Sequence, residues 1–312
     1  MIPRIYNDYG AWIRRHFPFR VQKISIDAGF SCPNRDGSIS SGGCSFCDKR
    51  TFNPSYCQPE KSITQQLEEG KRFFARKYPD MKYLAYFQAY SNTYGTLDDI
   101  KRKYEEALAV EDIVGLVVGT RPDCVGDEVL DYIESLSRHC FTTVEYGIES
   151  VNDDTLRRIN RGHTFQCSRE AIERTRSRGI TTGAHIILGL PGENAEENIR
   201  QASIVSSLPI DILKIHQLQV IRGTRLAREF NAHPFRLFTA DEYADVVINY
   251  LERLRPDIVV ERFASQSPAD MLIAPKWGLK NHEFTNLVVN RMKEKGTWQG
   301  RLAGTEGTSE SE

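Results

Sequence analysis

The chain is predicted to be an α/β protein, a partial (β/α)6 barrel with a C-terminal extension. Short apolar runs alternate with helical segments along the sequence, a pattern typical of parallel βαβ units. Because crossovers between parallel strands are right-handed, such units close into a barrel or part of one. The chain has 312 residues, 40% of them hydrophobic and 27% charged, which is the size and composition of a single α/β barrel.

The strands are predicted from apolar runs that end in polar or glycine-rich turns. The first run, VQKISIDA, alternates between apolar and polar residues, the period of a strand. The six predicted strands cover residues 21–28, 82–88, 113–119, 141–148, 182–188 and 211–219.

Helices are predicted between these strands, after a helical lead-in rich in aromatic and basic residues. Two of them begin with the capping-box pattern, in which Ser62 or Thr239 precedes a Gln or Glu three residues later. The predicted helices cover residues 62–77, 97–109, 127–137, 152–160, 166–178, 193–206 and 239–254.

The sequence predicts four parts. Residues 1–20 form the lead-in, and residues 21–255 form the barrel. Residues 256–303 form an extension that packs on the barrel, with an apolar segment at 258–263 and a helix near 282–295. Residues 304–312 are too polar to pack and are expected to form a disordered tail.

Composition predicts a cytoplasmic protein without membrane association. No apolar run approaches the roughly 18 residues that cross a bilayer, and the N-terminus has no signal-peptide pattern. Seven cysteines, several of them in one loop, indicate a reducing compartment and a metal site rather than disulfides. The net charge is −1, so binding to nucleic acid would need a local basic patch.

The loop after the first predicted strand, SCPNRDGSISSGGCSFC, carries three cysteines. Cys44 and Cys47 form a CxxC pair, and eleven residues separate Cys32 from Cys44. Three thiolates from one loop suit an iron–sulfur cluster with one iron left open. A structural zinc site normally has four protein ligands, and a thioredoxin-type pair would not need Cys32. Spacing alone leaves all three possibilities open.

Polar residues follow the second and third predicted strands, at the end of a parallel barrel where chemistry takes place. The turn after the second strand exposes backbone groups that suit an amino or carboxylate group, although an ordinary turn would look the same. After the third strand, Arg121 and Asp123 are expected to bind a ligand or to pair with each other. The candidate residues of the second turn are Gln88, Ala89, Tyr90, Ser91 and Asn92.

The fourth predicted strand contains Glu145 and Glu149, which an even spacing places on one face. Buried carboxylates are costly unless they are bound to something. A ribose diol is a natural partner for them, and Arg161 could neutralise a carboxylate. A structural Glu–Arg pair is the alternative.

The fifth and sixth predicted strands supply an apolar wall and two histidines. His185, Ile187 and Leu188 run into a Gly-Leu-Pro-Gly turn, which offers a flat surface suited to an adenine ring. His216 is either a substrate contact or a structural histidine, and His163 is either an acid–base group or a turn residue.

With these motifs in order, residues 20–225 resemble the radical S-adenosylmethionine (SAM) superfamily. The resemblance implies a [4Fe–4S] cluster bound by Cys32, Cys44 and Cys47, with Phe46 in the aromatic position between the last two. It also implies that residues 88–92 bind the amino-acid end of SAM, with the other SAM contacts made by Arg121, Glu149, Arg161, His185, Ile187 and Leu188.

The eleven-residue spacing departs from most of the superfamily but is similar to a YhcC-like subfamily of Fe–S oxidoreductases. Residues 120–123 and 160–163 are similar to the radical SAM core of the Elongator catalytic subunit. The resemblance implies reductive cleavage of SAM and hydrogen abstraction, with an electron donor of the flavodoxin or ferredoxin type. Glu145 and His216 are the candidate catalytic residues.

The expected substrate is a modified tRNA nucleoside, at the side chain of a wobble uridine. The alternatives are a metabolite, a protein side chain, or no catalysis at all in an Fe–S or zinc binding module. Arginines at 157–161 and 169–178 would contact RNA or simply form a solvated helix face, and Trp277 would stack on a base or pack the extension. The remaining thiols, ordinary buried groups or ligands of a second cluster, are Cys57, Cys124, Cys140 and Cys167.

Overall fold

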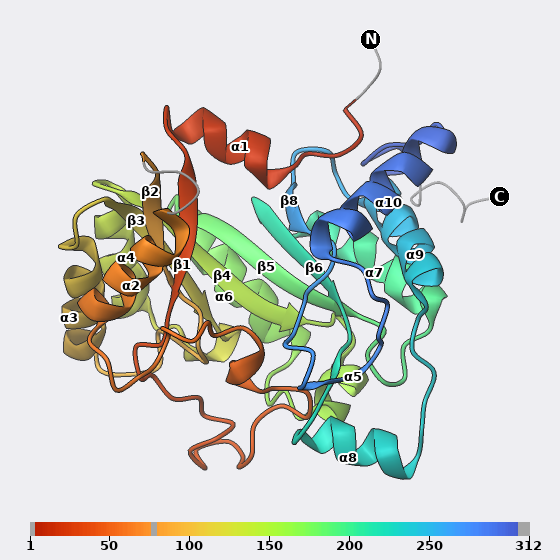
Figure 1. The fold of residues 1–312 in the computed structure, drawn as a ribbon, viewed down its shortest axis with the longest axis horizontal. Coiled ribbons are helices and arrows are strands. Elements are labelled where there is room, and N and C mark those ends of the chain that lie inside the picture. Colours follow the sequence, from red (N-terminus) through yellow and green to blue (C-terminus); the bar gives the residue numbers. More distant parts are fainter. Residues whose placement is uncertain (1–3, 76–79, 305–312) are drawn as a thin grey trace.

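A seven-stranded parallel sheet, curved into a half-barrel, organises the computed structural model, which describes residues 4–75 and 80–304 (Figure 1). Its strand order is β1-β2-β3-β4-β5-β6-β8, and every neighbouring pair is parallel. The strands are β1 (Val21–Ile26), β2 (Lys82–Phe87), β3 (Ile113–Thr120), β4 (Phe141–Glu149), β5 (Thr181–Leu188), β6 (Ile212–Gln217) and β8 (Val259–Arg262).

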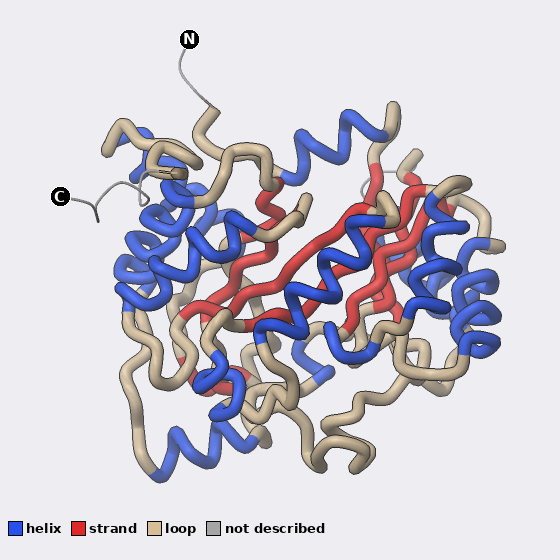
Figure 2. The backbone as a smooth tube through the Cα atoms, turned by 180° about the vertical axis from the view of Figure 1, so that it is seen from behind, coloured by secondary structure: helices blue, strands red, loops and turns tan. Residues whose placement is uncertain are grey.

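Helices follow the strands, and most of them cover the outer, convex face of the sheet (Figure 2). Those between strands are α2 (Ile63–Ala75), α3 (Leu97–Leu108), α4 (Asp127–Ser137), α5 (Asp153–Arg158), α6 (Phe165–Ser177), α7 (Ala195–Ser207), α8 (Arg225–Ala232) and α9 (Ala240–Arg253). The chain begins with α1 (Tyr9–His16) and ends with α10 (Asn281–Glu294). Shorter elements are the 3₁₀ turns η1 (Lys49–Thr51) and η2 (Pro122–Cys124) and the two-stranded antiparallel pair β7 (Val220–Ile221) and β9 (Leu272–Ala274).

The predicted strands and helices lie where the sequence placed them, within a few residues. The capping box at Thr239 is formed, since its side chain accepts from the Glu242 amide and Glu242 accepts from the Thr239 amide. The Ser62 hydroxyl accepts from the Gln65 amide at 3.0 Å. Residues 76–77 of the second predicted helix and 305–312 of the predicted tail lie outside the described residues.

The apolar segment predicted within the extension pairs with the barrel sheet as its seventh strand. Leu213 of β6 faces Val260 of β8 in parallel register. Strand β1, at the other edge of the sheet, is joined to β8 by an ion pair between Lys23 and Glu261, whose charged atoms are 2.6 Å apart. The short run at 258–263 carried no signal of this pairing, because the partner strand is distant in sequence.

Trp277 packs the extension. Its ring stacks on Phe284 of α10, with centroids 5.4 Å apart, and Nε1 donates to the Phe238 carbonyl at 3.0 Å. Trp277 and Tyr243 therefore hold α10 against α9. Of the two roles considered for Trp277, stacking on a base or packing the extension, the structure shows the packing role.

The main apolar core lies between the sheet and its helices and includes Ile24, Leu116, Val144 and Ile215. Strand alternation therefore sends the intervening side chains, among them Lys23, Glu145 and Lys214, to the inner face. Within residues 4–75 and 80–304, no helix has the length and apolar character needed to cross a bilayer.

Candidate active site at the open end of the half-barrel

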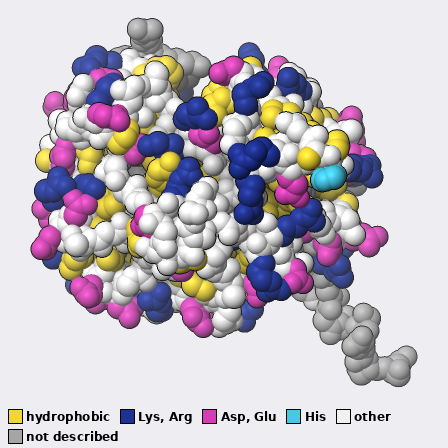
Figure 3. All heavy atoms as spheres, turned by 90° about the horizontal axis from the view of Figure 1, so that it is seen from below, with side chains coloured by type: hydrophobic (Ala, Val, Ile, Leu, Met, Phe, Trp, Pro, Cys, Tyr) yellow, Lys and Arg dark blue, Asp and Glu magenta, His cyan; other side chains and the backbone are white. Residues whose placement is uncertain are grey.

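A cavity of about 1230 Å³, its open mouth included, lies at the carboxyl ends of the strands. This is the end of a parallel barrel at which ligands bind. Its wall combines the cysteine loop with residues from six of the seven sheet strands or the turns that follow them, at Gln88, Arg121, Glu149, His185, His216 and Arg262. Figure 3 shows the molecule from this side.

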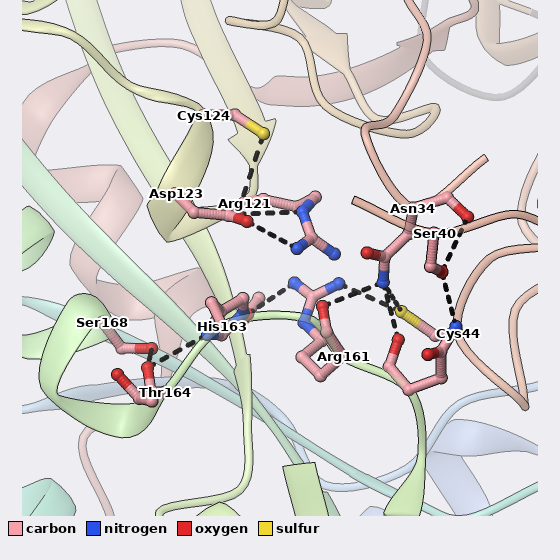
Figure 4. A network of polar contacts seen from close by, with 12 residues as sticks. Asn34, Ser40, Cys44, Arg121, Asp123, Cys124, Arg161, His163, Thr164 and Ser168 are labelled. Carbon is pink, nitrogen blue, oxygen red and sulfur yellow. Dashed lines mark hydrogen bonds and ion pairs between the residues drawn. The ribbon is translucent and has the colours of Figure 1, made fainter. Parts of the chain in front are cut away.

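The cysteine loop is fixed by Asn34, whose side chain is fully buried. Its amide donates to the carbonyls of Asn160 at 2.6 Å and Arg161 at 2.9 Å, and lies 3.6 Å from the Cys44 sulfur (Figure 4). The backbone of Ser45 also donates to the Ile159 carbonyl at 2.8 Å. The loop is therefore held to the turn after α5, over a hundred residues away in sequence.

Cys32, Cys44 and Cys47 all line the cavity and carry free thiols. Burial raises the pKa of the Cys47 thiol to about 12, and the neighbouring Cys44 and Cys32 add to this effect. A thiol of this kind stays protonated at pH 7 until a metal displaces the proton. Arg161 Nη1 lies 3.4 Å from the Cys44 sulfur and would balance a thiolate there.

The three sulfurs do not converge on one point. In the described residues, 4–75 and 80–304, no three Cys, His, Asp or Glu side chains are grouped closely enough to hold a single metal ion. A cubane cluster does not require such a group, because each thiolate binds a different iron atom. The open side of the thiol set faces the cavity.

Arg161 lies beside Cys44, and the guanidinium of Arg121 lies next to that of Arg161 (Figure 4). Arg161 Nη2 donates to the Gly147 carbonyl at 2.6 Å and lies 3.5 Å from Glu149. Arg121 forms a bidentate pair with Asp123, at 2.9 and 2.7 Å, as one of the two sequence alternatives proposed. Arg161 Nε and Arg121 Nη1 are buried without a partner among the described residues, so both arginines retain donors for a ligand.

Glu149 ends β4 in a left-handed conformation, with φ of 70°. The register of β4 against β5 skips one residue between Gly147 and Glu149, so a bulge turns the Glu149 side chain into the cavity. Burial raises the pKa of Glu149, although Arg161 and Arg121 oppose this shift.

The turn at 88–92 contributes Gln88, Tyr90 and Ser91 to the cavity wall. Asn92 is buried, and its amide donates to the carbonyls of Phe87 and Gly119, which holds the turn against β3. Ala89 is buried in the same turn. The Ser91 hydroxyl lies beside the Cys124 thiol at this wall.

An apolar wall forms on the side of β5. Ile187 lines the cavity and belongs to a small apolar cluster against which Phe46 packs. Leu188 points the other way, into the main core, so only its backbone faces the cavity side. Its carbonyl already accepts from the Leu218 amide at 2.9 Å.

The floor of the cavity is a buried network centred on Glu145. This carboxylate accepts from Lys23 at 2.9 Å, from Lys214 at 2.6 Å and from His185 Nε2 at 3.0 Å. Burial opposes its ionisation, but Lys214 and Lys23 hold its pKa well below the usual value. Burial likewise lowers the pKa of Lys214 to about 8 and that of His185 to about 4. Glu145 is therefore a saturated structural anion, unlike the free carboxylate expected of a catalytic base.

Sequence reasoning did not identify Lys23, Glu261 or Arg262 as site residues. The alternation of the first strand was a usable signal for Lys23, because it places this charge on the face opposite to Ile24 and Ile26. No local signal marked Glu261 or Arg262, since their strand was not assigned to the sheet.

Residues 36–201 match the radical SAM superfamily, and residues 210–294 match the radical SAM C-terminal domain. The chain belongs to the radical SAM superfamily.

Two similar radical SAM relatives match over nearly their whole length. The chain is 33% identical to the uncharacterized protein YtqA of Bacillus subtilis, over 95% of this chain and 92% of that one. It is 34% identical to the protein YhcC of Escherichia coli, over 88% of both chains. Elongator complex protein 3 of Schizosaccharomyces pombe is 28% identical over 59% of this chain, which is 33% of that protein.

Solved structures share the fold. The Elp3 protein of the archaeon Methanocaldococcus infernus superposes with a TM-score of 0.66 at 18% identity, covering 89% of this chain and 64% of that one. SuiB of Streptococcus suis bound to S-adenosylmethionine gives a TM-score of 0.51 at 9% identity, covering 80% of this chain and 53% of that one.

Membership in the superfamily implies a [4Fe–4S] cluster and SAM as cofactors. The cavity fits both groups, because it combines three free thiols with unpartnered arginine donors beside them and an apolar wall. The superfamily match begins at residue 36, downstream of Cys32. Ligation by Cys32, Cys44 and Cys47 therefore remains a prediction that rests on the loop and its geometry.

Proposed function

We propose that this radical SAM enzyme modifies tRNA, at the side chain of a wobble uridine. The observation that carries the proposal is a basic rim beside the cavity mouth. The relatives point the same way, since one is named tRNA uridine(34) acetyltransferase, from Methanocaldococcus infernus, 26% identical over 59% of this chain and 34% of that protein.

The basic rim consists of Arg50, Arg222, Arg225 and Arg228, all exposed. The last three follow β7 and begin α8, and among the described residues their guanidinium groups reach only backbone carbonyls. Arg50 is the exception, since it pairs with Asp48. In Figure 3, Lys and Arg side chains gather in a band on this face.

The rim is joined directly to the cysteine loop. The Leu226 amide in α8 donates to the Ser45 carbonyl at 2.8 Å, and Gly223 lies close to the Arg50 guanidinium. A polyanion bound to the rim would therefore lie over the mouth of the cavity. The whole chain has a net charge of −1, so a polyanion would have to bind through a local group of basic residues such as this rim.

The arginines of α6 do not form a comparable surface. Arg174 and Arg178 pair with Asp127, and Arg176 pairs with Asp211 on the outside of the barrel. They match the solvated helix face that the sequence also allowed. Arg161 is buried at the cysteines, so it is not available to RNA.

In this proposal the cavity residues bind and orient the cofactors. When bound, the cluster supplies the electron that cleaves SAM reductively and so initiates hydrogen abstraction from the substrate. Arg161 balances the charge at Cys44, Glu149 accepts from the ribose hydroxyls, and Ile187 packs against the adenine. The walls exclude water from the reacting atoms and fix their separation. Because reduction needs a source, a one-electron donor of the flavodoxin or ferredoxin type is part of the proposal.

The test is anaerobic reconstitution followed by quantification of 5′-deoxyadenosine, with and without bulk undermodified tRNA. We expect tRNA to raise the rate of 5′-deoxyadenosine formation several-fold. Slow formation that tRNA leaves unchanged would contradict the tRNA proposal and direct the search to metabolites or protein side chains.

The rim provides a matched comparison. In R222Q/R225Q/R228Q, tRNA affinity should fall, and the slope of log affinity against log salt should become shallower by about two to three units, one for each lost phosphate contact. The control R14Q/R15Q/R138Q removes the same charge from exposed positions on α1 and after α4. An equal loss in both variants would argue against the rim as the RNA surface.

A further inference from the structure

Arg262 is a cation in the cavity without an acceptor. Its side chain lines the cavity, yet within residues 4–75 and 80–304 it has no hydrogen bond and no ion pair. Its Nε is shielded from solvent and has no partner among those residues. Buried polar groups are nearly always hydrogen-bonded, so each exception calls for a reason.

A bulge in β8 aims this side chain into the barrel. The register against β6 runs from Leu213–Val260 directly to Lys214–Arg262 and skips Glu261. In a regular strand, successive residues face opposite sides of the sheet. Here Glu261 reaches Lys23 and Lys214 on the inner face, and Arg262 lines the cavity from the next position.

The carboxylates at the floor of the cavity are neutralised by lysines, so the positive charge of Arg262 is not needed to balance them. The carboxylates Glu145 and Glu261 are both paired with Lys23 and Lys214. Two anions and two cations thus balance one another, and the guanidinium of Arg262 is the additional charge on this side of the cavity. A partly buried, unpaired cation is costly unless an anion joins it.

His216 provides a second unused polar group on the same wall. Its Nε2 is buried without a partner in the described part of the chain, and the residue lines the cavity. Burial, followed by the nearby Arg262, His185 and Lys214, holds the pKa of His216 well below its usual value. The imidazole is therefore neutral at pH 7 and can donate one hydrogen bond. His185 lies beside it, with ring centroids 6.1 Å apart, but is committed to Glu145.

We propose that Arg262 and His216 form a subsite for an oxyanion on the substrate, either a carboxylate or a phosphate. A guanidinium binds such a group through two parallel hydrogen bonds, and the imidazole would add a third. The inference rests on the proposed function in that this subsite is the substrate end of the same cavity.

Other groups are available to the carboxylate of SAM, namely residues 88–92, which the resemblance assigns to its amino-acid end, and two arginines. Arg161 and Arg121 lie beside the cysteines, after β4 and β3, and each keeps a free donor. Arg262 lies on β8, at the edge of the sheet three strands beyond β4. The subsite would hold the substrate at the β8 side of the cavity, which positions its reacting hydrogen.

The direct test uses two anions as probes and needs neither tRNA nor turnover. Reconstituted enzyme with SAM bound is titrated with acetate or with inorganic phosphate, against chloride at equal ionic strength, and thermal unfolding is followed. We expect one of the two anions to raise the unfolding temperature of the wild type and of R138Q, but not of R262Q. A response to acetate identifies a carboxylate as the ligand, and a response to phosphate identifies a phosphate.

The proposal is overturned if neither anion stabilises the wild type, or if R262Q responds as the wild type does. The iron content of R262Q should equal that of the wild type, which shows that the variant is folded. H216Q should weaken the response while leaving Arg262 in place.

Kinetics separate this subsite from the SAM site. In R262Q we expect kcat/KM for tRNA-stimulated 5′-deoxyadenosine formation to fall roughly ten- to a hundredfold, the effect of a lost hydrogen bond to a charged group. The KM for SAM should stay within about twofold, on the same reasoning. A raised KM for SAM with unchanged response to tRNA would instead assign Arg262 to SAM.

The two proposals can fail separately. If tRNA has no effect on the wild type but the anion response still depends on Arg262, the tRNA substrate is wrong and the subsite stands. If tRNA stimulates R262Q as it does the wild type, the subsite is wrong and the tRNA substrate stands.

Discussion

Arg161 connects the cysteine loop with the end of β4. It contacts the Cys44 sulfur, the Gly147 carbonyl and Glu149 from a single guanidinium. Burial opposes its charge, but Cys44 and Glu149 raise its pKa, so it stays charged. Arg161 thereby links a proposed cluster ligand to the proposed ribose contact. A displacement of Cys44 or of Glu149 would shift the guanidinium and so move the other residue.

The three cysteines of the loop can be tested against cysteines elsewhere. Cys44→Ala should abolish iron–sulfur absorbance and 5′-deoxyadenosine formation, because one of three cluster ligands is removed. Cys140→Ala, which removes a half-buried thiol after α4, should leave both unchanged. Iron and sulfide analysis with product quantification makes the comparison. SAM cleavage by Cys44→Ala would refute the assignment.

Glu149 is expected to bind the ribose of SAM as a carboxylate. Glu149→Gln keeps the shape but loses a charged acceptor, which is worth about 1.5–3 kcal/mol in a hydrogen bond. The KM for SAM should therefore rise roughly ten- to a hundredfold, with the iron content unchanged. Steady-state kinetics with varied SAM measures this, and an unchanged KM would leave Glu149 as a structural partner of Arg161.

At the scale of elements, the cysteine loop depends on the turn after α5. Gly162 has a φ of 79°, and a Cβ there would lie 2.5 Å from Oδ1 of Asn34, the residue whose amide Nδ2 closes the junction. Gly179 has a φ of 72° but no neighbour within 4 Å of such a Cβ. The two glycines therefore carry similar backbone strain on substitution and differ only in the contact.

Gly162→Ala should consequently lose its cluster to an iron chelator faster than the wild type. Gly179→Ala should lower the free energy of unfolding by about 1–2 kcal/mol, because alanine disfavours the left-handed backbone conformation. It should keep its cluster. The rate of cluster loss and the free energy of unfolding measure the two effects. Equal rates of loss would mean that the junction does not govern cluster retention.

Two strand bulges also act at this scale. The bulge before Glu149 and the bulge at Glu261 each turn a charged side chain toward the cavity. Bulges re-aim side chains next to active sites in many folds. In this half-barrel they supply the residues that we assign to the ribose and to the substrate anion.

At the scale of the whole molecule, three half-buried histidines make the fold sensitive to acid. Burial lowers the pKa of His163 to about 3 and that of His185 to about 4, and it holds that of His216 well below the usual value. In the unfolded chain each would titrate near 6.5. As pH falls below about 6.5, the unfolded chain binds protons that the folded chain does not, so stability falls.

Each such histidine contributes about 1.4 kcal/mol per pH unit to the slope of unfolding free energy against pH. Glu149 and Glu193 have raised pKa values and act in the opposite direction, which reduces the total. His163→Asn should make the slope shallower by about 1.4 kcal/mol per pH unit between about pH 6 and 4. Urea unfolding of cluster-free protein at several pH values measures it. A slope equal to that of the wild type would mean that His163 is protonated in the folded state.

The sequence by itself determined the barrel, the cysteine loop and the polar turns at the strand ends. These are local properties: strand and helix periods are written in adjacent residues, and Cys44 and Cys47 are linked by their spacing. The same local pattern located Glu149 and Arg161, which the structure brings within 3.5 Å of each other.

Only the tertiary structure decided the substrate side of the cavity. Contacts between segments distant in the chain form the seventh strand and its skipped register at Glu261. Such contacts also hold α8 against the cysteine loop. The sequence also did not reveal that Glu145 is saturated by Lys23 and Lys214, since those two lysines are 191 positions apart in the printed sequence. Strand register and packing decide which charged side chains remain unpaired, because the partners of a charge are its neighbours in space and not in sequence.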